Sequence, residues 1–89
     1  MNADHMNVMI DKLYLLISKL NTPEDCKKLF DDLCTNKEIE QMAQRIEAAL
    51  LLKKGLTYAQ VIEQTDISSA TLSRVSRALQ YGEGYKKFI

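Results

Sequence analysis

The chain has 89 residues, of which 46% are hydrophobic and 27% charged, with one Pro and three Gly. This length allows one domain with a marginal core, and the composition excludes a disordered chain. Twelve Lys and Arg balance twelve Asp and Glu, so there is no global basic field to attract nucleic acid. The distribution is uneven, because residues 1–36 carry four Lys and six acidic residues, whereas residues 37–89 carry eight Lys or Arg and six acidic residues.

The sequence shows neither a signal peptide nor a membrane span. The N-terminus lacks a basic region followed by a long apolar run, and the longest apolar stretch, residues 13–20, contains Ser18 and Lys19. Cys26 and Cys34 lack paired spacing, and we interpret both as packing residues. We therefore expect no membrane association and a cytoplasmic protein with reduced thiols.

A first helix is predicted over about residues 7–20, after a polar and frayed segment at residues 1–6. Its apolar or amphipathic residues fill more than one stripe, and they are Val8, Met9, Ile10, Leu13, Tyr14, Leu15, Leu16, Ile17 and Leu20. A helix that is apolar nearly all round in so small a protein needs a second surface to cover it. A partner subunit is the natural candidate.

A second helix is predicted from Pro23 to about Cys34. Thr22 can act as its N-cap, and Pro23 suits the first helical position because its missing N–H would have no partner there. Its apolar face consists of Cys26, Leu29, Phe30 and Leu33.

The third and longest helix is predicted over about residues 37–54 and ends at Gly55. Its broad apolar face consists of Ile39, Met42, Ala43, Ile46, Ala49 and Leu50. Residues 48–52 are apolar at five successive positions, so we expect the C-terminal half of this helix to be covered on all sides.

Two short helices joined by a tight turn are predicted over residues 57–79. Thr57 can cap the first, about residues 58–64, and Ser68 can cap the second, about residues 69–79. Asp66 lies in the turn, where Asp tolerates the left-handed backbone better than most residues.

The second of these helices has two different faces. Leu72, Val75 and Leu79 fall on one face at 100° per residue, and the opposite face consists of Ala70, Ser73, Arg74 and Arg77. Short side chains at the N-terminal end with arginines further along are typical of a helix that enters a major groove. An ordinary helical hairpin with a solvated face would show similar periodicity.

The final ten residues leave one structural question open. Tyr81, Tyr85 and Phe88 could fold back on the body of the protein while Lys86 and Lys87 stay in solvent. Two glycines argue for a loose start, so the pattern does not decide whether a last helix forms.

The segment 57–79 resembles a bacterial helix-turn-helix, and residues 67–79, ISSATLSRVSRAL, resemble the recognition-helix signature of the tryptophan repressor superfamily. The match includes Gln44-Arg45 and residues 55–58 and 79–82, and it covers roughly residues 37–84. These features resemble the small tryptophan-repressor-related (TrpR-like) subgroup of bacterial transcriptional regulators.

This resemblance implies an all-α fold of five or six short helices in an intertwined homodimer. Residues 1–89 would form a single TrpR-like helical domain, with dimerisation helices at about residues 7–54 and a helix-turn-helix at about residues 57–79. The implied partner is double-stranded DNA with a palindromic operator, whose half-sites lie about one helical turn, or ~34 Å, apart.

The resemblance also implies a set of DNA-binding residues on and beside the recognition helix. Those expected nearest to base edges are Ser69, Ala70, Thr71 and Ser73. Those expected to meet phosphate are Tyr58, Ser68, Arg77 and Gln80. Arg74 lies between helix and core and could serve either role.

An effector pocket is the second implication of the resemblance. Arg74 matches the arginine that stacks on the indole of tryptophan, and Arg45 is the counterpart of the arginine that takes its carboxylate. Val75 stands where the repressor has a glycine that leaves room for the indole. We therefore expect tryptophan not to be the corepressor, and we predict no cofactor. Asp66 and Ile62 also depart from the usual Gly and Ala of the motif.

Catalysis and metal binding are not expected from these residues. No His lies in the predicted core, no Gly-rich phosphate loop occurs, and the carboxylates are scattered over exposed faces. Zinc would require more soft ligands than His5 and two cysteines provide. The competing functional class is a helical dimer that serves as a protein-interaction adaptor with a degenerate helix-turn-helix.

Overall fold

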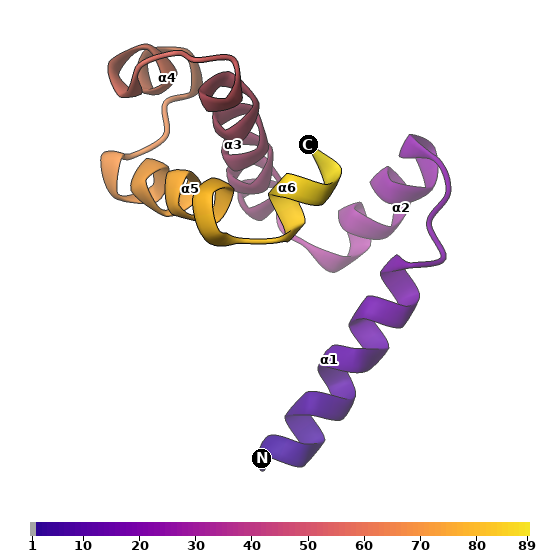
Figure 1. Ribbon diagram of the computed structural model, residues 1–89. Coiled ribbons are helices and arrows are strands. Elements are labelled where there is room, and N and C mark those ends of the chain that lie inside the picture. The colour runs from indigo at the N-terminus through magenta and orange to yellow at the C-terminus, as the bar shows by residue number, and fades with distance from the viewer. Residues whose placement is uncertain (1) are drawn as a thin grey trace. The chain divides into compact units, whose positions relative to one another are not determined.

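The computed structural model describes residues 2–89, whose regular structure is entirely helical (Figure 1). The helices are α1 Ala3–Ile17, α2 Pro23–Leu33, α3 Asn36–Lys53, α4 Tyr58–Thr65, α5 Ser69–Tyr81 and α6 Gly84–Phe88. The predicted all-α class with five or six helices is confirmed. No helix within residues 2–89 has both the length and the apolar character needed to cross a membrane. Within the described residues, the chain divides into two compact units, residues 2–35 and residues 36–89.

Helix α1 begins and ends earlier than its hydrophobic pattern predicts. The Asn2 side chain caps its start by accepting a hydrogen bond of 2.8 Å from the His5 N–H. The helix ends at Ile17, with Ser18 as the C-cap, rather than at Leu20. The predicted frayed segment is therefore wrong for residues 3–6, because a polar N-cap starts the helix ahead of its apolar stripe. Met1, also part of that prediction, lies outside the described residues.

Helix α2 follows its predicted start. The Thr22 hydroxyl oxygen accepts a hydrogen bond of 3.1 Å from the Asp25 N–H, and Pro23 occupies the first turn. The helix ends at Leu33, with Cys34 as the C-cap. Its first turn is thus stabilised by a side-chain cap and by acidic residues near the helix N-terminus.

The N-terminal unit has no buried residue on either of its helices in the single chain. On α1 the side chains of Tyr14 and Leu15 are 64% and 65% exposed. The other large apolar side chains exposed on this helix are Met6, Val8, Met9, Ile10, Leu13 and Leu16. This helix therefore presents apolar surface around much of its circumference.

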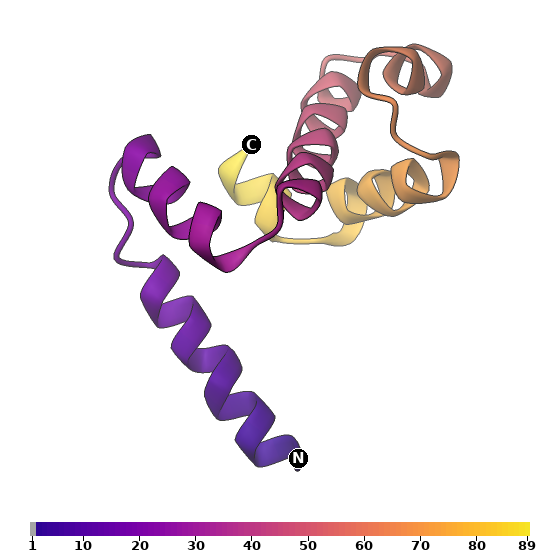
Figure 2. The same cartoon turned by 180° about the vertical axis from the view of Figure 1, so that it is seen from behind.

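The C-terminal unit contains the hydrophobic core. Its buried apolar residues come from α3, α4, α5 and the turn between the last two, and they are Ala48, Ala49, Leu51, Val61, Ile67, Leu72 and Val75. Helix α3 packs against both α4 and α5, and Figure 2 shows these three helices together from behind. The predicted apolar face of α3 is buried mainly towards its C-terminus, since Ile46 remains 42% exposed.

A short last helix, α6, resolves the question left open by the tail. The chain leaves α5 at Gly82, where a residue without a side chain is needed. A Cβ at this position would lie 2.6 Å from the Ala78 carbonyl oxygen, which is too close. Tyr85 packs against the core, as predicted, whereas Tyr81 and Phe88 are 78% and 77% exposed. Of the three aromatic residues, Tyr85 alone folds back on the body in this unit.

Candidate nucleic-acid interface

The α4–α5 pair begins with a reciprocal cap. The Thr57 hydroxyl accepts from the Gln60 N–H at 3.3 Å, and the Gln60 side-chain oxygen accepts from the Thr57 N–H at 2.9 Å. This capping box satisfies two backbone donors at the start of α4. The predicted cap at Thr57 is confirmed.

The turn between α4 and α5 is built without glycine. Asp66 adopts the left-handed conformation with φ 58°, as the sequence predicts. The buried Thr65 hydroxyl donates to the Val61 carbonyl at 2.7 Å and accepts from the Ile67 N–H at 3.3 Å. The Thr65 side chain therefore bridges the last turn of α4 and the residue after the turn.

A contact from α3 supports the same turn. The Gln44 side-chain amide donates to the Thr65 carbonyl at 3.1 Å, across 21 residues of sequence. This bond satisfies a carbonyl at the C-terminal end of α4 and ties the turn to the core helix. Sequence reasoning noted Gln44 in the family match but did not predict this positioning role. The signal that could have indicated this role is the position of Gln44, a polar residue next to the apolar face of α3.

Helix α5 begins with a cap at Ser68, also as predicted. The Ser68 hydroxyl accepts from the Thr71 N–H at 3.1 Å and donates to the Thr71 hydroxyl at 2.9 Å. Thr71 is half-buried, whereas Ser68 is exposed. These two hydroxyl groups stabilise the start of α5 by satisfying each other and one free backbone donor.

The two faces of α5 are separated as the periodicity predicts. Leu72 and Val75 are 0% and 2% exposed, and Leu79 is half-buried against the core. The exposed residues of the helix include Ser69, Ala70, Ser73, Arg74, Arg77 and Gln80. Tyr58, at the start of α4, is 45% exposed. The α4–α5 pair thus presents small polar side chains at the beginning of α5 and two arginines further along.

The arginines of α5 are free to meet a ligand. Within residues 2–89 neither Arg74 nor Arg77 forms an ion pair. An exposed guanidinium with no carboxylate partner can bind phosphate through two parallel N–H donors. This face therefore has the donors that a nucleic-acid backbone requires.

A polar pocket of about 360 Å³ lies beside the turn. Arg45 and Gln41 line it from α3, and Ser68 and Thr71 line it from the start of α5. Arg74 is not part of this lining, and Val75 is buried in the core. The structure thus places Arg45 next to the start of α5 but does not gather the three proposed effector residues around this pocket.

A second pocket brings lysines together at the other end of α5. Lys53 of α3 and Lys86 of α6 line a pocket of about 420 Å³, together with Gln80. Within the described residues, no group of three His, Cys, Asp or Glu could hold a metal ion. The two lysines of this pocket, with no Asp or Glu in its lining, are suited to binding an anion.

Comparisons with known proteins point to one family. Residues 9–89 match the family model for the Trp repressor protein. The uncharacterized protein YerC of Bacillus subtilis (strain 168) is 47% identical over 73 residues, which cover 82% of this chain and 70% of YerC.

Two solved structures share the fold. A candidate Trp repressor from Staphylococcus aureus is 41% identical with a TM-score of 0.84, and the match covers 90% of this chain and 81% of that protein. A TrpR-like protein from Eubacterium eligens ATCC 27750 is 36% identical with a TM-score of 0.85, covering 97% and 90% respectively.

The bond between Gln44 and the turn leads to a stability prediction. We expect Gln44→Ala to lower the free energy of unfolding by about 1 kcal/mol, because it removes a partly buried hydrogen bond. It should also speed amide hydrogen exchange at Ile67, measured by NMR. Gln41→Ala is the matched control, since Gln41 is exposed on the same helix and lines the same polar pocket. Equal effects of the two variants would contradict the positioning role.

Proposed function

This chain belongs to the Trp repressor family, and from that premise we propose that it is a sequence-specific transcriptional repressor that binds a palindromic operator as a homodimer. Members of the family are helix-turn-helix DNA-binding regulators and not enzymes. The observation that carries the proposal is the division of α5, whose Leu72 and Val75 are buried while Ser69, Ala70 and Ser73 face outward.

The proposed DNA contacts follow from the positions of exposed side chains, and of the half-buried Thr71, on the α4–α5 pair. Ser69, Ala70, Thr71 and Ser73 are short enough to let the start of α5 approach base edges closely. The residues proposed to meet phosphate are Tyr58, Ser68, Arg77 and Gln80, with Arg74 serving either role. The Ser68 hydroxyl caps α5 and donates its single O–H to Thr71, so its contact with phosphate would use a bridging water that donates to both oxygens.

We further propose that tryptophan is not the corepressor. The Val75 side chain is 2% exposed and belongs to the core, where it occupies volume that a glycine would leave open. Arg45 lines the polar pocket without Arg74. These observations support the proposal because Val75 fills the space that a glycine would leave for an indole ring, and because Arg74 does not line the pocket beside Arg45.

The homodimer is supported by α1. This helix has no buried residue in the single chain, although most of its central side chains are apolar. Contiguous exposed apolar surface of this kind marks a protein interface. A second copy of the chain is the occupant that the family resemblance implies.

The dimer proposal predicts the effect of a charge on α1. Wild-type protein should sediment as a dimer at about 10 μM. Leu15→Glu should shift it to monomer, because Leu15 is 65% exposed in the single chain and a glutamate there would place an unpaired charge in the proposed interface. Lys12→Gln, on the same helix, changes the charge by the same amount and is the control that should remain dimeric. A monomeric wild type at that concentration would contradict the proposal.

The direct test of function is selection of bound duplexes from a random DNA pool at about 150 mM salt, with and without tryptophan. We expect enrichment of a palindrome whose half-sites lie about 10 base pairs apart, unchanged by tryptophan. Enrichment that required tryptophan would overturn the closed pocket. The absence of any enriched sequence would favour the adaptor alternative, which is supported by the balanced charge and by the presence of only two arginines on α5.

Two substitutions on α5 should separate affinity from specificity. Arg77→Ala should weaken binding to all sequences about equally and reduce the slope of log K against log salt by about one for each protomer, or about two per dimer, because each protomer loses a phosphate contact. Ser73→Ala should instead alter the preference among operator sequences. Lys19→Ala, which changes the net charge equally at a site remote in sequence, controls for charge alone. An unchanged salt slope in Arg77→Ala would argue against the phosphate contact.

A further inference from the structure

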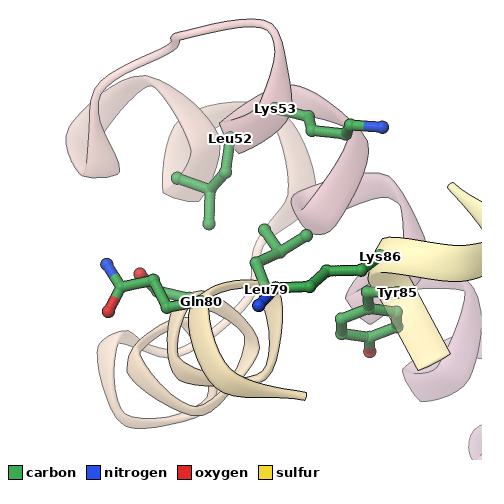
Figure 3. A pocket seen from close by; sticks show the side chains of 7 residues that line it. Leu52, Lys53, Leu79, Gln80, Tyr85 and Lys86 are labelled. Atoms are coloured by element: carbon green, nitrogen blue, oxygen red, sulfur yellow. The ribbon is translucent and has the colours of Figure 1, made fainter. Parts of the chain in front are cut away.

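We propose that the pocket between α3, α5 and α6 binds a small amphiphilic carboxylate, that is, an anion with an apolar body. Figure 3 shows this pocket, which has a volume of about 420 Å³. Ligand pockets in proteins typically have volumes of ~300–1,000 Å³. We call it the C-terminal pocket, and it shares no lining residue with the polar pocket beside the turn.

The body of the ligand is indicated by the apolar part of the lining. Leu52 of α3 and Leu79 of α5 point toward one another across the pocket (Figure 3). The Tyr85 side chain of α6 adds a half-buried aromatic surface, and all three residues also pack against the core. A small hydrocarbon or aromatic group bound here would lose contact with water on several sides.

The charge of the ligand is indicated by two lysines. Lys53 and Lys86 line the pocket from α3 and α6, and no Asp or Glu is part of the lining. Lys86 forms no hydrogen bond or ion pair within residues 2–89, and its side chain extends from α6 toward Leu79 (Figure 3). The Lys53 ammonium donates to the Ile89 backbone oxygen and keeps further donors for a ligand.

Two uncharged polar groups complete the lining. Ser76 and Gln80 contribute a hydroxyl and an amide from α5, one turn apart. They can orient a carboxylate by hydrogen bonds while the ammonium groups supply the charge. Because these residues belong to α5, a bound molecule would contact the same helix that carries Ser69, Ala70 and Ser73.

The test is titration of the isotope-labelled full chain with phenylacetate, monitored by NMR at about 150 mM salt without DNA. We expect amide shifts centred on residues 76–80 and 85–86, with a Kd of about a millimolar, as suits a fragment of about ten non-hydrogen atoms. Phenylacetamide, the neutral analogue, should bind at least about fivefold more weakly. Since the readout uses no DNA, its failure would leave the proposal of DNA binding standing.

Matched lysine variants make the test specific. Lys53→Gln and Lys86→Gln should each weaken phenylacetate binding about two- to fivefold, the range expected for a partly exposed ion pair. Lys54→Gln and Lys87→Gln remove the neighbouring charges, which lie outside the lining, and should leave the Kd within about 1.5-fold of wild type.

Four results would overturn the proposal. The first is absence of saturable shifts, and the second is equal binding of acid and amide. The third is an equal response to inorganic phosphate, which would reveal a basic surface with no selectivity for an apolar body. Shifts centred on the polar pocket beside the turn would likewise assign the ligand to a different site.

Discussion

The position of α5 depends on the core that it shares with α3 and α4, to which α3 contributes two alanines. Ala48 and Ala49 are completely buried, and so are Val61 of α4 and Leu72 of α5. Because interaxial distance depends on the side chains at the contact, methyl groups on α3 let both helices approach closely. Larger residues at these positions would push α4 and α5 outward and change the angle at which α5 is presented.

This packing also separates the two faces of α5. The side chains that hold the helix against the core are buried, and those of Ser69, Ala70 and Ser73 near its N-terminal end are exposed to solvent. Hydrogen bonds at the turn reinforce this arrangement. The Thr65 hydroxyl bonds to backbone groups before and after Asp66, and the Gln44 side chain of α3 bonds to the Thr65 carbonyl. The left-handed backbone at Asp66, a position that glycine would adopt more easily, is therefore stabilised by the surrounding hydrogen bonds.

Local patterns predicted the elements whose signals lie within one helix or turn. The caps at Thr57 and Ser68, the left-handed Asp66 and the inward face of α5 were predicted from residue type and spacing. The predicted start of α1 at residue 7 was wrong, because the apolar stripe begins several residues after the Asn2 cap that starts the helix. The bond from Gln44 to Thr65 and the C-terminal pocket were beyond prediction, because each joins residues from separate helices through tertiary packing.

The exposed apolar surface of α1 has a consequence for dosage. Under the proposed dimerisation, the free energy that orders the N-terminal unit comes from association, so mass action links its folding to protomer concentration. While most of the protein is monomeric, the occupied fraction of an operator would then rise with the square of the protein concentration. A regulator built in this way responds to its own abundance with a threshold, even if no small molecule takes part.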